Sequence, residues 1–506
     1  MKKIHDLKKL SKIIKSLKLK KNKIVLSHGV FDLLHIGHIK HFESAKKLGH
    51  KLIVSVTKNE FVDKGPNRPL FDLRLRMEAI ASLSCVDFVT YGNLDSAVDV
   101  IEHLKPDIYC KGQDYKILKK DVSKKIYKEK NAVLKNKGKI NFTNEINFSS
   151  SKILNTTGLV LNKHQKTFVE RLSKRIKKKN YASLFDKIKE QKVVILGEMI
   201  IDKYNFCDPL GKSGKDPIMM FSKKKEEKYV GGAGAIANHV AQITKNTYLC
   251  CMIGEYDSNR TFIEKNISKK IIKKYIVKKN SPTIEKQKYL DSVTLNKIIG
   301  FYKYNEEKIN TKQEIQILNF LQKTLDKDSI LVVADYGHSM ISEKLAKKIS
   351  NLKNFVSLNA QINAANIGTH NIKKYTNLDF VIINESELRN ELRNNIDKTE
   401  ILMIKISKMY NFKILVVTKG KDGVILYNKS KNKFYFCPAF SDKVVDKIGS
   451  GDAMLPIISS IYKNTHDEEL SLFIGSLAAA QKVQIMGNSK SIDGMKLIKT
   501  FNHLIN

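Results

Sequence analysis

Short apolar runs alternate with stretches of helical periodicity along the first third of the chain. Each run has the length of a buried strand, and the runs lie at 24–27, 51–57, 86–90 and 107–110. Between them, residues such as 94–104 repeat their apolar positions at helical spacing. Strands that alternate with helices in this way indicate a parallel, doubly wound sheet. We therefore expect an α/β domain over residues 1–155.

A second alternation begins abruptly at residue 193 and continues to the end of the 506-residue chain. Its predicted strands include 193–197, 330–333, 380–383 and 414–417. Residues 156–190, between the two alternations, are polar and lysine-rich with apolar residues at helical intervals, which predicts a helical linker. A single core rarely serves more than about 300 residues. We therefore expect a second doubly wound parallel-sheet domain over residues 191–506.

Composition agrees with a globular protein and excludes some other classes. The hydrophobic fraction is 42%, and the sequence contains no apolar run of the about 18 residues that a membrane span requires. The net charge of +40 arises from lysines scattered over the whole length, which predicts a solvated surface and neither a nucleic-acid nor a membrane partner.

Cysteine usage and the first residues bear on the compartment. The six cysteines form no C-x-x-C pair, so reduced thiols are expected rather than a disulfide framework or a metal site. Residues 1–23 alternate Lys with Ile and Leu and lack the features of a secretory signal. We expect a cytoplasmic protein.

The first chemical motif spans residues 29–38, G-V-F-D-L-L-H-I-G-H, between a strand and a helix. Gly37 allows the backbone to approach a triphosphate, and the helix start offers N–H groups to it. His35 and His38, three residues apart, can stabilise charge that develops at the α-phosphorus during displacement.

These residues resemble the cytidylyltransferase-like nucleotidyltransferases, whose G-x-F-D-x-x-H-x-G-H pattern is matched in full. The segments K-G-P-N-R-P at 64–69, R-M at 76–77, K-G-Q-D-Y at 111–115 and S-S-S at 149–151 are similar to further motifs of that family. The resemblance implies a Rossmann-like domain in which His35 and His38 are catalytic. The nucleotide and phosphate ligands that it implies are Gly29, Phe31, Asp32, Gly37, Lys64, Arg76, Lys111, Asp114, Ser150 and Ser151.

The second motif, D-K-I-G-S-G-D at 446–452, precedes a predicted helix from about residue 453. Gly449, Ser450 and Gly451 can present backbone N–H groups to a phosphoryl group as an anion hole. Asp452 then lies in the first helical turn, where the helix start favours its ionised form. It is placed there to accept a proton from an attacking hydroxyl, as a general base.

This motif resembles the C-terminal signature of the ribokinase-like carbohydrate kinases, and the resemblance covers about residues 190–490. It implies ATP as substrate and Mg²⁺ as cofactor, with Glu387 of N-x-x-E organising the metal indirectly. The residues that it implies for the nucleotide and phosphates are Asn384, Glu387, Thr418, Gly420, Gly449, Ser450 and Gly451, and those for the sugar are Asp202, Gly231, Gly232, Lys286 and Asp335.

Two positions depart from the family on the sugar side. Ala235 and Ile236 stand where an asparagine is expected, and His338 stands where heptose kinases have lysine after D-Y-x. The P-T-I-E-K segment at 282–286 nevertheless resembles heptose 7-phosphate kinases, in which Lys286 would meet the substrate phosphate. The sugar therefore stays open.

Together the domains resemble bifunctional heptose 7-phosphate kinases and heptose 1-phosphate adenylyltransferases, with the domain order reversed. The resemblance implies an enzyme that makes ADP-heptose and pyrophosphate, binds small molecules and forms a homo-oligomer, expected to be a dimer. Two alternatives stay open: a cytidylyl- or guanylyltransferase acting on another sugar, and an active transferase fused to a sugar-binding domain without turnover.

Overall fold

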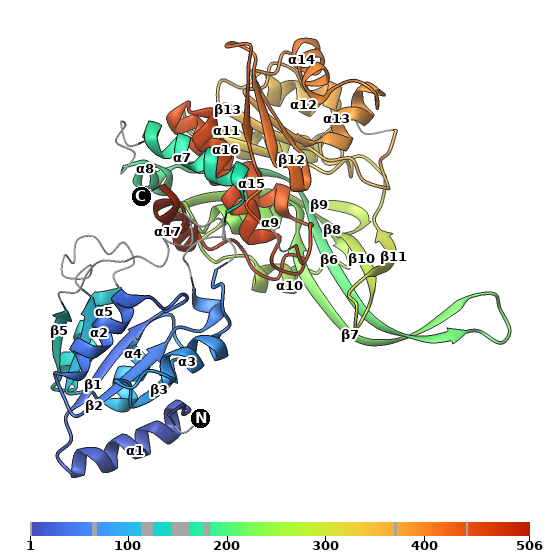
Figure 1. The fold of residues 1–506 in the computed structure, drawn as a ribbon. Coiled ribbons are helices and arrows are strands. Elements are labelled where there is room, and N and C mark those ends of the chain that lie inside the picture. The colour runs from blue at the N-terminus through green and yellow to red at the C-terminus, as the bar shows by residue number, and fades with distance from the viewer. Residues whose placement is uncertain are drawn as a thin grey trace. The chain divides into compact units, whose positions relative to one another are not determined.

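The computed structural model describes residues 3–62, 68–112, 125–143, 161–176, 183–368, 372–441 and 444–505. The chain folds into two compact units, Met1–Thr167 and Phe168–Ile498, and the last residues are divided between them. Each unit has its own sheet (Figure 1). The units are described separately.

The first unit is built on five parallel strands in the order β3-β2-β1-β4-β5. The strands are β1 (Ile24–Gly29), β2 (Lys51–Val56), β3 (Phe88–Tyr91), β4 (Ile108–Gly112) and β5 (Lys139–Thr143). The helices are α1 (Leu7–Leu19), α2 (Ile36–Lys46), η1 (Asn59–Phe61), α3 (Leu73–Ala81), α4 (Val98–Leu104) and α5 (Lys125–Lys135). The strand order reverses between β1 and β4, the position at which such sheets bind ligands beyond their carboxyl ends.

The apolar residues of this sheet face two clusters, one on each side. One cluster joins Val25 and Val54 to Phe42 of α2 and Ile80 of α3. The other joins Leu26 and Ile53 to residues of α1 and α4, of which Leu10 is fully buried. Both faces of the sheet are thus covered, as a buried parallel sheet requires. The predicted doubly wound fold is confirmed for this unit.

The second unit contains a twelve-stranded sheet whose main path is β11-β10-β6-β12-β13-β14-β15-β16-β17. Its strands are β6 (Lys192–Lys212), β7 (Met219–Gly231), β8 (Asn246–Tyr256), β9 (Ile272–Pro282), β10 (Ile284–Asp291), β11 (Lys297–Lys303), β12 (Ile330–Asp335), β13 (Phe355–Ala360), β14 (Phe380–Asn384), β15 (Ile414–Thr418), β16 (Val424–Asn428) and β17 (Lys433–Cys437). Strands β9, β8, β6, β12, β13, β14 and β15 are mutually parallel. The predicted parallel sheet is confirmed, with antiparallel strands β16 and β17 added at one edge.

Helices flank this sheet and carry the second motif. They are α7 (Lys163–Ile176), α8 (Leu184–Glu190), α9 (Gly232–Val240), α10 (Arg260–Asn266), α11 (Thr311–Thr324), α12 (Glu343–Ser350), η4 (Ile372–Lys374), α13 (Glu385–Leu392), α14 (Thr399–Met409), η5 (Gly420–Asp422), α15 (Ser450–Thr465), α16 (Glu468–Lys482) and α17 (Gly494–Ile505). The middle of α15, from Ala453 to Tyr462, and most of α16 are buried, so the motif at the start of α15 precedes a helix that is anchored in the core.

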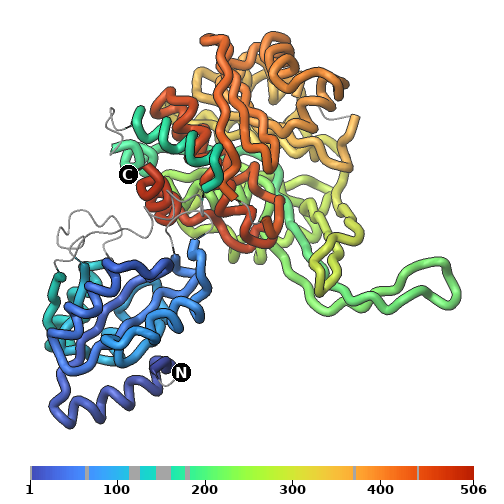
Figure 2. Tube along the Cα trace, in the orientation of Figure 1, coloured from blue at the N-terminus to red at the C-terminus, as the bar shows by residue number. Residues whose placement is uncertain are grey.

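The first and second parts of strand β6 pair with different neighbouring strands, a feature that the apolar pattern did not predict. Residues 192–198 pair with β8, and 193–197 also pair with β12. Residues 200–212 pair instead with β7 and β10. The outer part of β6 and β7 forms the long hairpin that extends from the unit in Figure 2. The sheet therefore continues past the carboxyl ends of the core strands, where it can cover a ligand.

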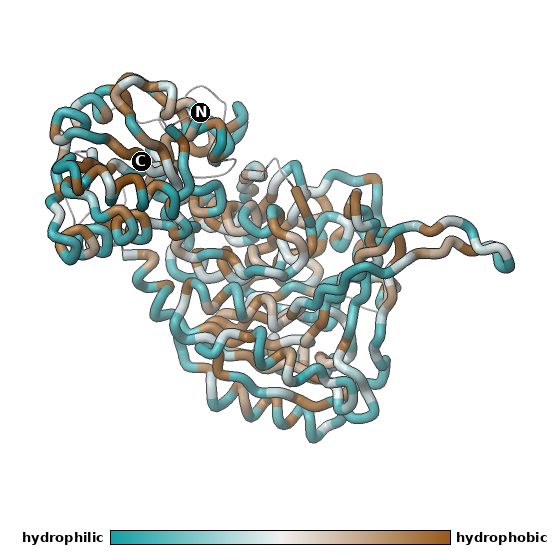
Figure 3. The backbone as a smooth tube through the Cα atoms, turned by 90° about the horizontal axis from the view of Figure 1, so that it is seen from below, coloured by the Kyte–Doolittle hydropathy of each residue, from teal (hydrophilic) through white to brown (hydrophobic). Residues whose placement is uncertain are grey.

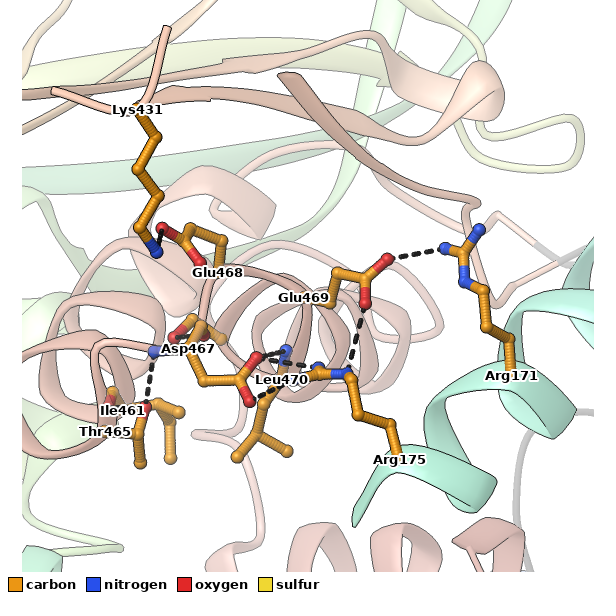
Figure 4. Close-up of polar contacts among 10 residues, drawn as sticks. Arg171, Arg175, Lys431, Ile461, Thr465, Asp467, Glu468, Glu469 and Leu470 are labelled. Atoms are coloured by element: carbon orange, nitrogen blue, oxygen red, sulfur yellow. Dashed lines mark hydrogen bonds and ion pairs between the residues drawn. The ribbon is translucent and has the colours of Figure 1, made fainter. Parts of the chain in front are cut away.

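Helix α7 lies in the segment predicted as a linker and is tied to the second unit by ion pairs (Figure 4). Arg175 forms a bidentate pair with Asp467, with an Nη2–Oδ1 distance of 2.8 Å. Arg171 binds the Glu469 carboxylate at 2.7 Å. Asp467 also caps α16 by accepting from the Leu470 amide. The second half of the predicted linker thus packs on the unit that follows it.

Hydrophobic and hydrophilic stretches alternate along the chain in both units (Figure 3). Among the residues that the structure describes, no helix is both long and apolar enough to cross a membrane.

Candidate active sites

The first candidate site forms where β1 ends and α2 begins. Gly29 is the last residue of β1, and a Cβ there would lie 2.8 Å from the Phe31 ring, which would have to move. His35 is the N-cap of α2, and its Nδ1 accepts a hydrogen bond from the Gly37 amide at 3.2 Å. An Nδ1 that accepts implies that the neutral ring carries its proton on Nε2. The ring can therefore donate from Nε2 to a bound group.

The two motif histidines lie together. The rings of His35 and His38 are stacked, with centroids 3.9 Å apart. Phe31, whose φ of 48° is in the left-handed region, contacts the His38 ring edge-on at 5.2 Å. This turn therefore brings both imidazoles to one place at a helix N-terminus, which suits them to the stabilisation of a phosphate.

The side chains of Asp32 and Arg76 bind protein groups around this turn and do not point into open space. Asp32 is buried, pairs with Arg68 Nε at 2.5 Å, and accepts from the amides of Leu70 and Phe71. Arg76 is also buried, and it donates to the carbonyls of Val30, Thr57 and Phe71 and to the side chain of Asn59. Burial lowers the pKa of Arg76, whereas Asp32 raises it.

This arrangement bears on the predicted roles of Asp32 and Arg76. Four donors of the Arg76 guanidinium are engaged by protein acceptors, so its geometry is that of a brace between β1 and α3. Contact of Arg76 with a phosphate stays a prediction beside this structural role. Arg68, which sequence reasoning left out of the site, is the charge partner of Asp32.

Lys111 lies at the end of β4 and is also buried. Its ammonium pairs with Glu129 of α5 at 3.2 Å, and Glu129 accepts from Tyr109 Oη and the Ala97 amide. Burial raises the pKa of Glu129, but Lys111 and these donors outweigh it and leave that pKa lowered. Four other predicted ligands lie outside the described residues: Lys64, Asp114, Ser150 and Ser151.

The second candidate site lies at the start of α15. Gly449 is its N-cap, with a φ of 78° in the left-handed region that favours glycine. Ser450 and Gly451 form the first turn, followed by Asp452. Asp452 accepts a hydrogen bond from Tyr336 Oη at 2.8 Å. Burial raises the pKa of Asp452 to about 6, and the Tyr336 bond acts in the opposite direction.

The predicted sugar residues Asp202 and Lys286 face each other across β6 and β10, where they are register partners. Asp202 accepts from Lys288 Nζ at 2.6 Å. A Cβ on Gly231 would lie 2.4 Å from the Asp202 carboxylate and would displace it. Lys286 is buried, which lowers its pKa, while Asp202 and Asp452 raise it. The charges of Asp202, Lys286 and Asp452 therefore interact with one another.

Asp335, the remaining predicted sugar residue, is engaged by the protein. Its carboxylate accepts from Tyr375 Oη at 2.7 Å and from the Gly337 amide, and it pairs with Lys374 at 2.6 Å. The following loop is held by Glu198, which accepts from the amides of Tyr336, His338 and Met340. Burial and Asp335 raise the pKa of Glu198 to about 7. Asp335 thus supports this loop, and its contact with the sugar stays a prediction.

The N-x-x-E residues Asn384 and Glu387 form a capping box at the start of α13. Glu387 accepts from the Asn384 amide at 2.7 Å and from the Ile362 amide at 3.3 Å. Burial raises the pKa of Glu387 to about 7. Thr418 ends β15, and Gly420, at a φ of 58°, opens the turn after it. These residues lie at carboxyl ends of neighbouring parallel strands β14 and β15.

No cluster of three or more His, Cys, Asp or Glu side chains suited to hold a metal ion occurs among the described residues. Both Glu387 oxygens already accept from backbone amides, so this carboxylate fits contact with a hydrated Mg²⁺ rather than direct ligation. The residues that sequence reasoning missed are Glu198 and Tyr336, each joined to the site by a contact distant in sequence.

Comparisons with known proteins agree with this division. The pattern of the pfkB family carbohydrate kinases matches residues 190–494, and the cytidylyltransferase-like pattern matches 26–156. Phosphofructokinase-2 from Escherichia coli, solved in complex with potassium, aligns with a TM-score of 0.50 and 12% identity over 63% of this chain and 100% of its own. At this identity the likeness concerns the fold alone.

Two bacterial proteins illustrate the sequence relatives. The bifunctional protein HldE of Nitratiruptor sp. is 23% identical over 305 residues, 58% of this chain and 62% of that protein. The protein of the same name from Helicobacter pylori is 43% identical over 108 residues, 21% of this chain and 23% of its own length. The chain thus matches less than two thirds of either relative. The chain belongs to the pfkB family of carbohydrate kinases and carries a cytidylyltransferase-like domain before the kinase.

Proposed function

We propose that the second unit transfers the γ-phosphoryl group of ATP to a hydroxyl of a sugar phosphate. The observation that carries this proposal is the half-buried Asp452 at the glycine-rich start of α15, close to Asp202 and Lys286. Asp202 would orient the sugar hydroxyls. The amides at Gly449–Gly451 would stabilise charge on the transferring group.

In this step the sugar hydroxyl oxygen attacks the γ-phosphorus and the bond to the β,γ-bridging oxygen breaks. ADP leaves, and the hydroxyl proton passes to the Asp452 carboxylate. Bound Mg²⁺ would neutralise phosphate charge, and Glu387 would hold its hydration shell. Asp452 must be ionised to accept the proton, so kcat/KM is expected to fall as the pH decreases through about 6.

Replacement of Tyr336 by phenylalanine is expected to move this pH dependence. Tyr336 Oη donates to Asp452 and favours its carboxylate form. Without that donor the pKa of Asp452 rises, and the acid limb of kcat/KM moves to higher pH by about one unit, the size of one hydrogen bond to a charged group. A pH profile of the Tyr336→Phe enzyme tests this, and an unmoved limb would contradict the assigned contact.

We propose heptose 7-phosphate as the sugar, phosphorylated at C1. Lys286 and Lys288 are two residues apart on β10, so they lie on one face of the strand beside Asp202. Two ammonium groups can bind a phosphate, and the neighbouring carboxylate can accept from hydroxyls, so this arrangement is suited to a sugar phosphate. His338 stands in place of the lysine of heptose kinases, and a different phosphorylated sugar is the alternative.

For the first unit we propose adenylyl transfer. A sugar 1-phosphate oxygen attacks the α-phosphorus of ATP, the bond to the α,β-bridging oxygen breaks, and pyrophosphate leaves. His35 and His38, stacked at the start of α2, would stabilise charge on the α-phosphate. The product would be ADP-heptose. CTP or GTP in place of ATP is the alternative.

The remaining expectations concern binding partners and the cellular compartment. The predicted partners are small molecules alone, without nucleic acid or membrane, and the predicted compartment is the cytoplasm. The six cysteines are all free thiols, which suits a reducing compartment. A homodimer also stays a prediction, supported by the exposed side chains of the β6–β7 hairpin, Leu210, Ile218, Met219, Met220 and Phe221.

A panel of sugar phosphates with ATP, CTP and GTP tests the proposal. We expect ATP to be converted to ADP when heptose 7-phosphate is present. We expect pyrophosphate to be released from ATP when heptose 1-phosphate is present. Release with CTP or GTP alone would favour the alternative base. Robust phosphorylation of free hexoses with none of heptose 7-phosphate would overturn the sugar assignment. Binding of ATP and sugar phosphate without transfer would show that the second unit is a binding module.

A further inference from the structure

Lys482, the last residue of α16, is completely buried. Lysine is almost never fully buried without a partner, because the ammonium loses its hydration. The Lys482 Nζ donates to two backbone carbonyls, those of Ile448, at 3.4 Å, and Gly487. Burial lowers the pKa of Lys482, and Asp452, Asp446 and Asp202 raise it. The ammonium is thus an internal cation close to three carboxylates.

The two carbonyls belong to two loops that meet beside the phosphoryl-transfer motif. One loop, residues 444–449, leads into α15, and the other, 483–488, leaves α16. The amides of Val445 and Asp446 donate to the Val483 carbonyl, and the Gly487 amide donates to the Asp446 carboxylate at 3.1 Å. Lys482 adds the charged contact between them.

The position of the ammonium bears on the anion hole. Ile448 C=O and Gly449 N–H belong to one planar trans peptide, so they point in opposite directions. A cation that draws the Ile448 carbonyl toward itself therefore turns the Gly449 N–H away from itself. The stem of Lys482 lies against this glycine, since a Cβ on Gly449 would be 3.1 Å from Lys482 Cε.

We propose that Lys482 is a positioning residue for phosphoryl transfer: a tethered ammonium that fills a carbonyl-lined cation position and fixes the peptide of the anion hole. This inference rests on the kinase activity proposed above. Backbone carbonyls are also the ligands that potassium selects in proteins. Because Lys482 supplies the charge covalently, the enzyme needs no dissociable monovalent cation at this position.

Two substitutions separate the charge of Lys482 from its volume. Lys482→Ala leaves an ammonium-sized space beside the Ile448 and Gly487 carbonyls, whereas Lys482→Met fills the space without charge. We expect both to lower kcat by roughly 10², the effect of losing one oxyanion donor, with a smaller change in the KM for ATP. Ammonium or potassium chloride is expected to restore Lys482→Ala at least about tenfold, with no effect of choline chloride. Neither salt should restore Lys482→Met.

Several results would overturn the inference. Wild-type-like kcat in both variants would do so, as would equal restoration of both by salt, no restoration of Lys482→Ala, or a wild-type enzyme that loses activity when choline replaces potassium. Thermal unfolding with ATP shows whether each variant is folded.

A second measurement is independent of the substrate. Crystals of Lys482→Ala soaked in rubidium chloride are expected to show an anomalous peak between the Ile448 and Gly487 carbonyls, and wild-type crystals are expected to show none. If no sugar phosphate is turned over by the wild type, the proposed function fails while the rubidium peak still decides the cation position. Absence of the peak would contradict the inference even in an active kinase.

Discussion

Replacement of Asp452 by asparagine is expected to abolish phosphoryl transfer while ATP binding is largely kept. The amide has the shape of the carboxylate and can still accept from Tyr336 Oη, but it cannot take the substrate proton. Loss of a general base typically lowers the rate by about 10²–10⁴. Steady-state kcat with sugar phosphate and titration of ATP binding measure the two properties.

Asp328→Asn is a matched control, because Asp328 is an exposed residue of the same unit. It should leave kcat unchanged. Adenylyl transfer by the first unit should also be unaffected in Asp452→Asn. If Asp452→Asn turned over like the wild type, the base would be another residue and the assignment of the motif would be wrong.

Replacement of His35 or His38 by alanine is expected to abolish pyrophosphate release and to leave the kinase near normal. The stacked imidazoles are placed at the start of α2, and loss of one donor to a developing charge costs about 10²–10³ in rate. Pyrophosphate release with a sugar 1-phosphate and ADP release with a sugar phosphate measure the two activities in one preparation.

His35 is also a helix cap, so a second substitution is needed to isolate its chemistry. Asparagine is a preferred N-cap residue, and His35→Asn should therefore keep the helix start and still lose the activity. His103→Ala, at an exposed position of α4 in the same unit, should retain it. Equal loss of both activities in His35→Ala would refute independent active units.

Local rules of sequence were sufficient for the central parallel strands and the motif turns, but not for the pairing of β6 with β7 and β10. Most apolar runs correspond to strands because they are buried on both faces, as for 330–333 within β12, whereas the run at 86–90 is only partly buried and its strand is Phe88–Tyr91. Gly449 was predictable because a left-handed residue before a helix favours glycine. Asp452 was predictable because it lies in the first turn of that helix, which faces the same ligand as Gly449. Asn384 and Glu387 could be found by a second rule, since N-x-x-E also has the spacing of the capping box that forms there.

The sequence does not indicate contacts between residues that are distant along the chain. Glu198 and Lys482 are one acidic and one basic residue among many, and only the fold buries them under the loops that they hold. The helix start was expected to favour an ionised Asp452, yet burial is the larger effect and raises its pKa to about 6. Arg76, predicted to bind phosphate, donates to carbonyls from three separate segments, contacts that the sequence did not indicate.

The ion pairs of α7 redefine where the kinase begins as a cooperative folding unit. Arg175 neutralises Asp467, whose side chain is only 5% exposed and whose backbone position starts α16. A polypeptide trimmed to the first strand at Lys192 would leave that carboxylate without its guanidinium, a state that strongly destabilises buried pairs. Helix α16 in turn carries Lys482, so the stability of the anion hole depends on a helix that precedes the catalytic sheet in sequence. Limits drawn from strands alone would therefore cut through a single foldon.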